Sequence, residues 1–447
     1  MLIEIKKLLS NIKENKIIYY LMLVALFGYI SRYIFNAVLS HYLQPSLFGD
    51  FNIAVRVLGI LTSFALLGTN YSTKRFFSRY LHRHDENGLQ NYIQWNLNII
   101  RLPFILCVVV ALAAYIIMRE LHVWHLKDIQ TYHLAIYMFW VAPVAALLSL
   151  LSTYLLCAEH PIFYKLMTNM VYFIATFIFL IIVYTFDISF NGYWLVSVLF
   201  LSFTGLVFVT ILFIIKKTPY LFQSFSIAMH SKALKFVHPD WKVVSMRMAA
   251  NGLISLIIFS IDLIILELIS PIEDSVGLYA AALTISTFLI VIPQNLYAML
   301  SIQVHELCST LEGRKKLEES IMRLNRNSMV ITIFFGVAML MGSKTLLLHF
   351  GSIYLQAESI LKILIVGFIV NAFGQAPVTV LSYGGHEKWM VRISTIELLT
   401  LLILCSLLTY FFGIVGTATA TSLTLISKTL LSHYIAYRQA NIKTYLM

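Results

Sequence analysis

The sequence predicts an all-α integral membrane protein with twelve transmembrane helices. Of its 447 residues, 60% are hydrophobic and only 12% are charged, whereas soluble domains carry roughly 45–50% and 25%. The mean hydropathy is +0.83. Twelve apolar runs each approach the roughly 20 residues that a helix needs to cross a bilayer. This composition excludes an ordinary soluble enzyme.

Charged or turn-forming residues bound each apolar run and define the expected spans. In chain order these spans cover residues 17–40, 51–70, 95–117, 131–156, 164–185, 193–215, 243–268, 277–300, 328–349, 359–382, 393–412 and 414–436. The loops between them are short, so little of the chain remains for a soluble domain.

Basic residues outnumber acidic ones by 32 to 21, which gives a net charge of +11. They lie between the apolar runs, and 23 of the 32 fall on one side of the expected membrane. Because cytoplasmic loops are enriched in Lys and Arg, we expect both termini to be cytoplasmic. The charge therefore indicates membrane topology, and we expect no nucleic-acid partner.

The expected spans divide into two six-helix lobes. Around them we expect an amphipathic segment on the membrane surface, a cytoplasmic linker and a cytoplasmic tail. The boundaries are 1–16 for the amphipathic segment, 17–215 for the N-terminal lobe, 216–242 for the linker, 243–436 for the C-terminal lobe and 437–447 for the tail.

Two pairs of landmarks suggest that the lobes are a parallel repeat. Lys165 and Arg392 follow the fourth and tenth spans, at an offset of 227 residues. Gly49 and Gly277 stand before the second and eighth spans, at an offset of 228. Since six spans separate equivalent points, the two halves would be related by an axis along the membrane normal.

No catalytic or metal-binding motif is visible. The sequence has no GxxxxGK[ST], GxSxG or HExxH pattern. Its cysteines show no CxxC spacing and are expected to act as small apolar residues: Cys107, Cys157, Cys308 and Cys405. We therefore expect neither an enzyme, nor a metal site, nor a cofactor.

Three arginines within spans are the candidate substrate ligands. A charge at the bilayer centre costs roughly 2.5–3.5 kcal/mol, so Arg32 and Arg56 should face a water-filled cavity. They lie at similar expected depths and could converge on one diphosphate, with Arg247 as a third ligand. The alternatives are neutralisation of Arg32 by a buried acid such as Asp262 and snorkelling of Arg247 into water.

Four other basic residues are expected to snorkel from the ends of spans: Arg101, Lys344, Lys362 and Lys428. Two acids within spans, Asp262 and Glu397, could bind a proton or sodium ion during coupled transport. A fixed ion pair or an interhelical hydrogen bond is the alternative, and it is favoured for Glu397.

Polar residues beside two prolines mark expected kinks in the eighth and tenth spans. The prolines are Pro293 and Pro377. The polar residues could contact sugar hydroxyls, although packing between helices is their commoner use. They are Gln294, Asn295, Asn371 and Gln375.

Four stretches carry a family resemblance: SLFGDFNIAVRVLGILTSFALLGTN, DSVGLYAAALTIS with Asp262 upstream, GGHEK and FFGIVGTATATSLTLI. In this order, and with twelve spans, the chain resembles the Wzx-type polysaccharide-unit flippases of the multidrug/oligosaccharidyl-lipid/polysaccharide exporter superfamily. The matching positions are Gly49, Phe51, Asp262, Gly277, Tyr279, Gly385, Gly413 and Gly416. Most are expected to be architectural, with the last two glycines forming a tight outer turn and a close helix approach.

The resemblance implies a MATE-like, V-shaped transporter in the bacterial inner membrane. Its substrate would be an undecaprenyl-diphosphate-linked oligosaccharide, such as an O-antigen, capsule or exopolysaccharide unit, moved from the cytoplasmic to the periplasmic leaflet. Membrane lipids, a polysaccharide polymerase and a chain-length regulator are the implied partners. In lipopolysaccharide synthesis this step would supply the polymerase.

Departures from related families separate the alternatives. Multidrug members typically carry an acid and a proline in the first span, and residues 17–40 contain neither. Peptidoglycan-precursor flippases typically have fourteen spans and an Arg-Asp pair, whereas Tyr33 follows Arg32 here. A cation-coupled MATE-type efflux antiporter remains the main alternative function. A membrane glycan polymerase is disfavoured because the longest expected outer loop, about residues 118–130, is short.

Overall fold

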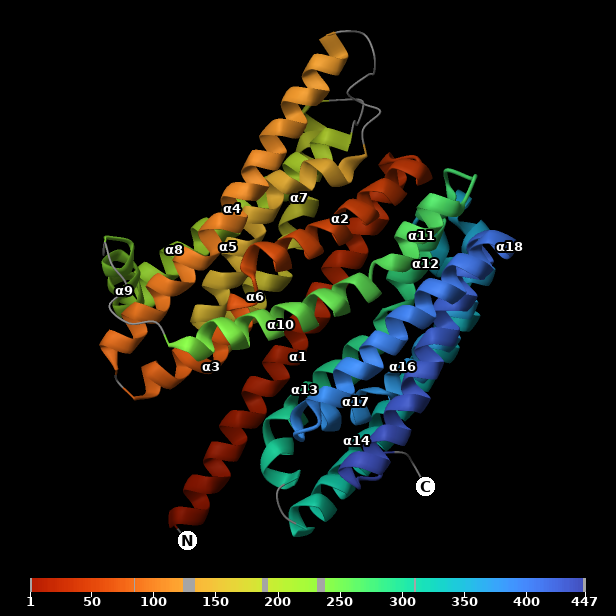
Figure 1. The fold of residues 1–447 in the computed structure, drawn as a ribbon. Helices are drawn as coiled ribbons and strands as arrows, with labels where there is room; N and C mark the ends of the chain where they lie inside the picture. The colour runs from red at the N-terminus through yellow and green to blue at the C-terminus, as the bar shows by residue number, and fades with distance from the viewer. Residues whose placement is uncertain are drawn as a thin grey trace. The chain divides into compact units, whose positions relative to one another are not determined.

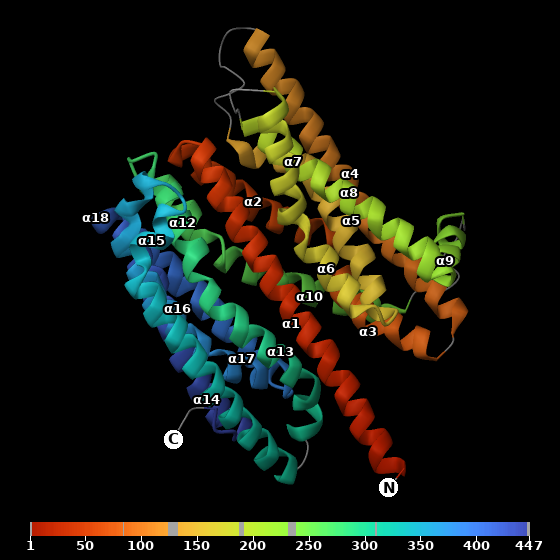
Figure 2. The same ribbon diagram turned by 180° about the vertical axis from the view of Figure 1, so that it is seen from behind.

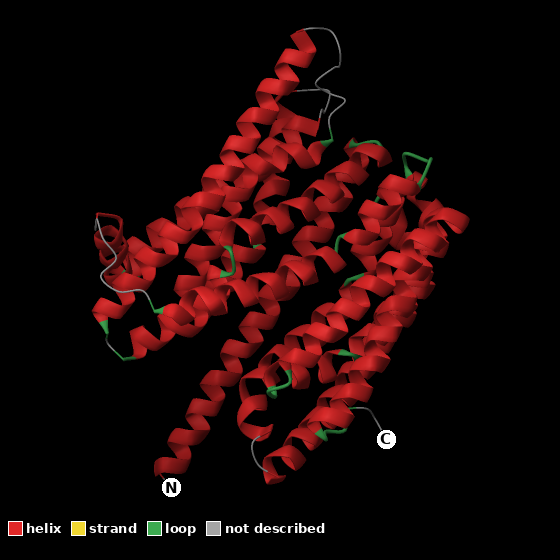
Figure 3. Cartoon of the chain, viewed as in Figure 1, coloured by secondary structure: helices red, strands yellow, loops and turns green. Residues whose placement is uncertain are grey.

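The computed structural model describes residues 2–83, 85–123, 133–186, 192–230, 238–308 and 311–444. Helices dominate throughout these ranges, and none of the described residues lies in a strand (Figure 3). The all-α prediction is confirmed.

Two compact units divide the chain. The central unit is Asp50–Leu256, and the terminal unit combines Met1–Gly49 with Ile257–Met447. Each is described below by itself (Figures 1 and 2).

The central unit contains most of α2 (Pro45–Leu66), whose first turn belongs to the terminal unit. Its other helices are α3 (Thr69–His82), α4 (Glu86–Val123), η2 (Leu134–Tyr137), α5 (Met138–Cys157), α6 (Pro161–Asn169), α7 (Val171–Phe186), α8 (Gly192–Lys217), α9 (Pro219–His230) and most of α10 (Pro239–Ile258). Residues 231–237 of the expected linker lie outside the described residues.

The terminal unit contains α1 (Leu2–Tyr42) and the helices of the second half of the chain. These are α11 (Ile261–Ile269), α12 (Ser275–Ser286), α13 (Phe288–Cys308), α14 (Leu311–Met341), α15 (Ser343–Leu348), η3 (Ser352–Ala357), α16 (Glu358–Phe373), α17 (Gln375–Tyr383), α18 (Glu387–Ile435) and η4 (Ala436–Ala440). The expected amphipathic segment continues into α1 without a break, and its side chains lie outside the described part of the chain.

Ten helices of the described residues are long and apolar enough to cross a membrane, or eleven when the bent pair α12 and α13 counts as one span. One of the ten, Glu387–Ala440, is 54 residues long. Each predicted span overlaps a helix of the structure, although the helices extend beyond several of the expected boundaries.

The unit boundaries differ from those expected for the lobes, because α1 packs with the second half of the chain. The Tyr29 hydroxyl lies 2.8 Å from the Thr284 carbonyl oxygen and 3.1 Å from that of Ile285. Its ring lies 5.2 Å from the Phe288 ring, between centroids. These contacts attach α1 to the bend between α12 and α13, a long-range pairing that hydropathy does not encode.

The start of the expected seventh span belongs instead to the central unit. Ser245 Oγ on α10 donates a hydrogen bond of 2.7 Å to the Leu67 carbonyl oxygen. Gly68 has φ +74°, and a Cβ there would lie 2.2 Å from the Ser245 carbonyl oxygen. Only glycine combines this backbone conformation with so close a helix approach. The junction of α2 and α3 therefore holds α10.

Gly49 and Gly277, the landmarks of the proposed repeat, contact each other within the terminal unit. A Cβ on Gly49 would lie 2.8 Å from the backbone nitrogen of Gly277. A Cβ on Gly277 would lie 2.0 Å from the Pro45 carbonyl oxygen. The Ser46 backbone N–H donates to Asp274 Oδ1 over 3.2 Å. The starts of α2 and α12 thus cross at backbone distance.

The chain reverses direction at Gly413, inside α18. Gly413 has φ 57° and ψ −139°, a non-helical conformation. Thr409 and Thr417 hydrogen-bond through their hydroxyls at 2.8 Å, which a straight helix would place roughly 12 Å apart along its axis. A Cβ on Gly416 would lie 1.8 Å from the Leu408 carbonyl oxygen. The expected tight turn at Gly413 and close approach at Gly416 are both confirmed.

We predict that Gly416→Ala lowers the free energy of unfolding by about 1–3 kcal/mol, because the added methyl group forces the two limbs of α18 apart. Thermal and denaturant unfolding of the detergent-solubilised protein measures this change. Gly205→Ala on α8 is the matched control, since its Cβ would meet nothing within 4 Å. Equal stability of both variants would contradict the close approach.

Candidate functional site

Arg32 lies in the terminal unit and is half-buried on α1. It is ten residues before the end of this helix at Tyr42, or about 15 Å along the axis at ~1.5 Å per residue. Tyr29 lies three residues earlier on the same helix. One turn later, Asn36 Nδ2 donates to the Arg32 carbonyl oxygen over 3.0 Å.

Arg56 lies in the central unit and is 7% exposed on α2. It stands eleven residues after the start of this helix at Pro45, or roughly 16 Å along the axis. Asn52, one turn earlier, is also buried. A polar stripe therefore runs along an otherwise apolar helix. Such a stripe is typical of a helix that faces a polar interior.

Arg247 is exposed on α10 of the central unit. Its neighbours Ser245 and Ala249 face the junction of α2 and α3, and successive helical residues point about 100° apart. Arg247 therefore projects from another face of the helix. The structure assigns Arg56 and Arg247 to one unit and Arg32 to the other.

Asp262 is 4% exposed at the start of α11. Its carboxyl oxygens accept hydrogen bonds of 2.8 Å from the Tyr279 hydroxyl and from the Leu263 backbone N–H. Tyr279 also hydrogen-bonds Thr421 Oγ1 at 2.9 Å. Because the tyrosine proton goes to Asp262, Thr421 is the donor in the second bond. This network joins α11, α12 and the second limb of α18.

Glu397 forms a fixed ion pair, which is the alternative to ion coupling that the sequence favours for this residue. Its Oε1 lies 2.9 Å from Lys428 Nζ, across the two limbs of α18. The side chain of Glu397 is 2% exposed and that of Lys428 is 23% exposed. The expectation that Lys428 snorkels is therefore wrong, because a buried acid on the facing limb offers a closer partner than water.

Glu358 forms ion pairs with two other lysines that are expected to snorkel. Lys362 Nζ lies 2.6 Å from Glu358 Oε1, and Lys344 Nζ lies 4.0 Å from Oε2. Both lysines are exposed. These are surface ion pairs near the start of α16.

The expected glycan contacts all belong to the terminal unit. Gln294 is exposed, Asn371 is buried, and Asn295 and Gln375 are half-buried. Asn295 Nδ2 donates to the Val291 carbonyl oxygen over 2.7 Å, so this amide is used within its own helix. Gln294 and Gln375 lie on α13 and α17, which pack against each other.

The helix breaks near the two prolines lie earlier in the chain than expected. The 43° bend falls between α12 and α13, several residues before Pro293. The other break, at Gly374, precedes α17, and Pro377 lies within that helix's first turn. Proline lacks a backbone donor and is tolerated in the first turn, where the N–H would have no intrahelical partner.

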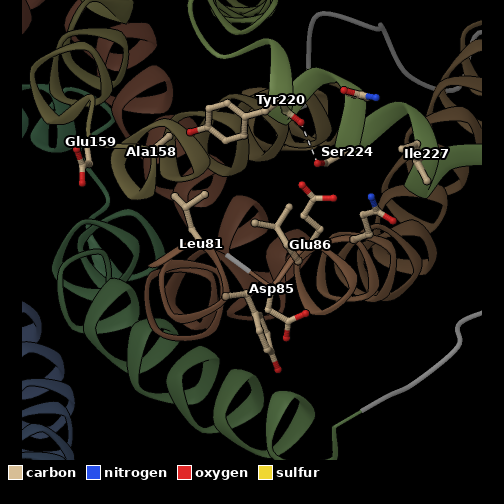
Figure 4. Close-up of a pocket in the computed structure, with 12 residues that line it drawn as sticks. Leu81, Asp85, Glu86, Ala158, Glu159, Tyr220, Ser224 and Ile227 are labelled. Atoms are coloured by element: carbon tan, nitrogen blue, oxygen red, sulfur yellow. Dashed lines mark hydrogen bonds between the residues drawn. The ribbon is translucent and has the colours of Figure 1, made fainter. Parts of the chain in front are cut away.

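A hollow of about 670 Å³ in the central unit was not anticipated from the sequence. It is lined at helix ends of α3, α4 and α9 and by the turn after α5 (Figure 4). Asp85, Glu86 and Glu159 contribute carboxylates, and Tyr80 and Tyr220 contribute rings. An acidic lining opposes a diphosphate, so we do not assign the lipid phosphates to this hollow.

Lys74 on α3 is a second feature that the sequence did not single out. Its Nζ lies 5.9 Å from the ring centroid of Tyr71 and 5.8 Å from that of Tyr164. The Lys74 side chain is exposed, but nearby protein partly desolvates the ammonium group and lowers the pKa of Lys74. In the sequence, Lys74 is one lysine among several basic residues of a loop. Its contact with Tyr164 could not be predicted, because the two residues are 90 positions apart along the chain.

Solved structures with the same fold are transporters and a flippase. An inward-facing multidrug resistance MATE family transporter of the MOP superfamily has a TM-score of 0.74 and 13% identity, over 93% of this chain and 94% of that chain. The lipid II flippase MurJ, in an inward closed conformation, has a TM-score of 0.69 and 14% identity, over 93% and 86%. The Vibrio cholerae MATE transporter VcmN in its bent form has a TM-score of 0.57 and 14% identity, over 95% and 96%.

At these identities the structural likeness establishes a MATE-like fold. No match is found among curated proteins. The sequence itself supplies the family, since residues 15–304 match the family described as polysaccharide biosynthesis protein. The resemblance to Wzx-type flippases of the MOP superfamily is thereby confirmed. The chain belongs to the polysaccharide biosynthesis protein family.

Proposed function

We propose that this protein translocates undecaprenyl-diphosphate-linked oligosaccharides from the cytoplasmic to the periplasmic leaflet of the bacterial inner membrane. The observation that carries the proposal is Arg56, a guanidinium 7% exposed within an apolar helix. A permanent cation at that depth interacts strongly with an anionic group brought close to it, because electrostatic interactions are stronger in a medium of low dielectric constant. The family and the fold already make the protein a membrane transporter or flippase, and the buried cation favours an anionic lipid as substrate.

The proposed topology has twelve spans and cytoplasmic termini. A straight 54-residue helix would be about 81 Å long, far more than the roughly 30 Å of hydrocarbon in a bilayer. We therefore count the two limbs of α18 on either side of Gly413 as separate spans. The orientation rests on the concentration of basic residues in the loops of one side.

In the proposed mechanism, Arg32 and Arg56 hold the diphosphate and Arg247 contacts it nearer the cytoplasm. Arg32 and Arg56 stand about equally far, along their own helices, from the turn that joins α1 to α2. Alternating access would carry the glycan through a wet cavity, with Gln294, Asn295, Asn371 and Gln375 as glycan contacts, while the lipid tail stays in the bilayer. Outward movement of about two negative charges gains roughly 4–5 kcal/mol per 100 mV of inside-negative potential.

The proposal assigns ion coupling to Asp262. Its carboxylate is buried and accepts a hydrogen bond from the Tyr279 hydroxyl, and a proton or sodium ion would be exchanged at this group. Glu397 is assigned a structural role because Lys428 neutralises it. The proposal includes no enzymatic step and no cofactor, and it places a polymerase and a chain-length regulator downstream.

The alternative of cation-coupled multidrug efflux fits the fold but fits the charges less well. An efflux pump for organic cations needs unneutralised acids along its path. Of the two buried acids of the described spans, Glu397 is neutralised by Lys428, and the candidate ligands Arg32, Arg56 and Arg247 are cations that would repel such a substrate. A drug-accumulation assay separates the alternatives, since a flippase leaves drug accumulation unchanged.

We predict that Arg32→Gln and Arg56→Gln each reduce glycan export at least tenfold in a complementation assay. A hydrogen bond to a charged group contributes about 1.5–3 kcal/mol, which corresponds to roughly a 10- to 150-fold effect. Arg83→Gln is the matched control, because Arg83 is exposed outside the spans. Normal export by both the Arg32 and the Arg56 variant, at normal protein levels in the membrane, would refute the assignment.

A charge-reversal series tests the structural role of Glu397. Glu397→Lys places two cations together and should destabilise the protein by about 3–5 kcal/mol, as breaking a buried ion pair does. Combining it with Lys428→Glu should restore stability and export. If Glu397 instead carries a coupling proton, the reversed pair would fold normally and still fail to export.

A further inference from the structure

We propose that Lys74 and Lys165, with the flanking Tyr71 and Tyr164, form a second phosphate-binding site, which receives the lipid's diphosphate on the cytoplasmic side before the buried arginines do. All four residues belong to the central unit. The role in loading rests on the proposed function, whereas the binding of a phosphate anion does not. This site uses lysines and tyrosines instead of arginines, and its residues lie on α3 and α6, which carry none of the three arginines.

The geometry brings α3 and α6 together at this point. Lys74 Nζ lies 5.8 Å from the ring centroid of Tyr164, the residue directly before Lys165, and the two lysines interact electrostatically. α5 packs against both α3 and α6 and so holds these two helices in place. Cys157 Sγ, at the end of α5, contacts the Thr73 carbonyl oxygen of α3 at 3.8 Å. The position of Lys74 beside α6 is therefore set by the fold.

Tyr71 completes the site from the other side of Lys74. Its ring centroid is 5.9 Å from Nζ, within the range of a cation–π contact. A Cβ at Gly252 of α10 would lie 3.3 Å from the Tyr71 hydroxyl. The glycine thus leaves room for a phenol group that can donate a hydrogen bond to an anion.

No acidic side chain of the described ranges forms an ion pair with either lysine. Other basic residues of the same chain do have acidic partners, as Lys362 and Lys428 illustrate. Glu159, the acid nearest in sequence to Lys165 on its N-terminal side, lines the acidic hollow instead. Lys74 and Lys165 repel each other electrostatically, and an anion that binds both ammonium groups would convert that repulsion into attraction.

A phosphate ester is the anion that fits this set of donors. Lysine ammonium groups are compact point charges with three donors each, suited to phosphate oxygens without a fixed approach direction. The phenol hydroxyls add donors beside them, and the exposure of Lys74 and Tyr71 leaves the site accessible. A loosely directional site of this kind suits transient capture, whereas arginine holds phosphate more rigidly.

Calorimetry on the full-length protein in zwitterionic nanodiscs tests the site. The probes are farnesyl diphosphate for a lipid-linked diphosphate, inorganic pyrophosphate for a free one, and nanodiscs containing phosphatidylglycerol for a lipid headgroup. The protein is prepared with Arg32→Gln and Arg56→Gln, so that the buried arginines do not contribute. Lys74→Gln and Lys165→Gln should each weaken farnesyl diphosphate binding about tenfold, while the double Lys→Arg variant should bind within about threefold of the parent.

Lys217→Gln is the matched control, since Lys217 is an exposed lysine at the end of α8 in the same unit. Equal affinity of the Lys74, Lys165 and Lys217 variants would overturn the site. A preference for phosphatidylglycerol over both diphosphates would overturn its assignment to the substrate. If the lysine variants lose binding but the arginine variants export normally, the result would support the anion site and refute the proposed function.

Discussion

The cost of placing charge inside a bilayer organises this structure. Each charge within an apolar helix must find a counter-charge, a set of hydrogen-bond donors or water. Glu397 and Lys428 neutralise each other across the two limbs of α18. Asp262 accepts hydrogen bonds from Tyr279 and the backbone. Arg32 and Arg56 lie within α1 and α2, and the proposed function assigns the substrate's diphosphate to them.

Close helix approach is the second constraint, and glycine makes it possible at a few positions. Three glycines pack against the backbone carbonyl group of another segment. The pairs are Gly277 with Pro45, Gly416 with Leu408, and Gly68 with Ser245. At each of these places a backbone surface packs directly on another backbone, which is a frequent way for membrane helices to associate. The hydrogen bond from Ser46 to Asp274 strengthens the first of these crossings.

Much of the fold could be predicted from the sequence because hydrophobic length is a local property. The spans, the reversal at Gly413 and the close approach at Gly416 all follow from short windows of sequence. The packing of Tyr29 against the bend between α12 and α13 could not, since its partners are 255 residues away. For the same reason the pairing of Lys428 and the convergence of Lys74 with Tyr164 required three-dimensional information. In the sequence, Arg32, Arg56 and Arg247 are identifiable as charges that are costly to place within apolar helices, because no short window of sequence shows what they contact.

The most direct test of the central claim is a leaflet-translocation assay in proteoliposomes with two fluorescent polyprenyl lipids. Both lipids carry the same oligosaccharide, but one is linked through a diphosphate and the other through a neutral spacer of equal length. If Arg32 and Arg56 recognise the phosphates, the protein will translocate the diphosphate-linked lipid, and the neutral lipid will cross only at the rate measured without protein. Translocation of both lipids at equal, protein-dependent rates would contradict the account.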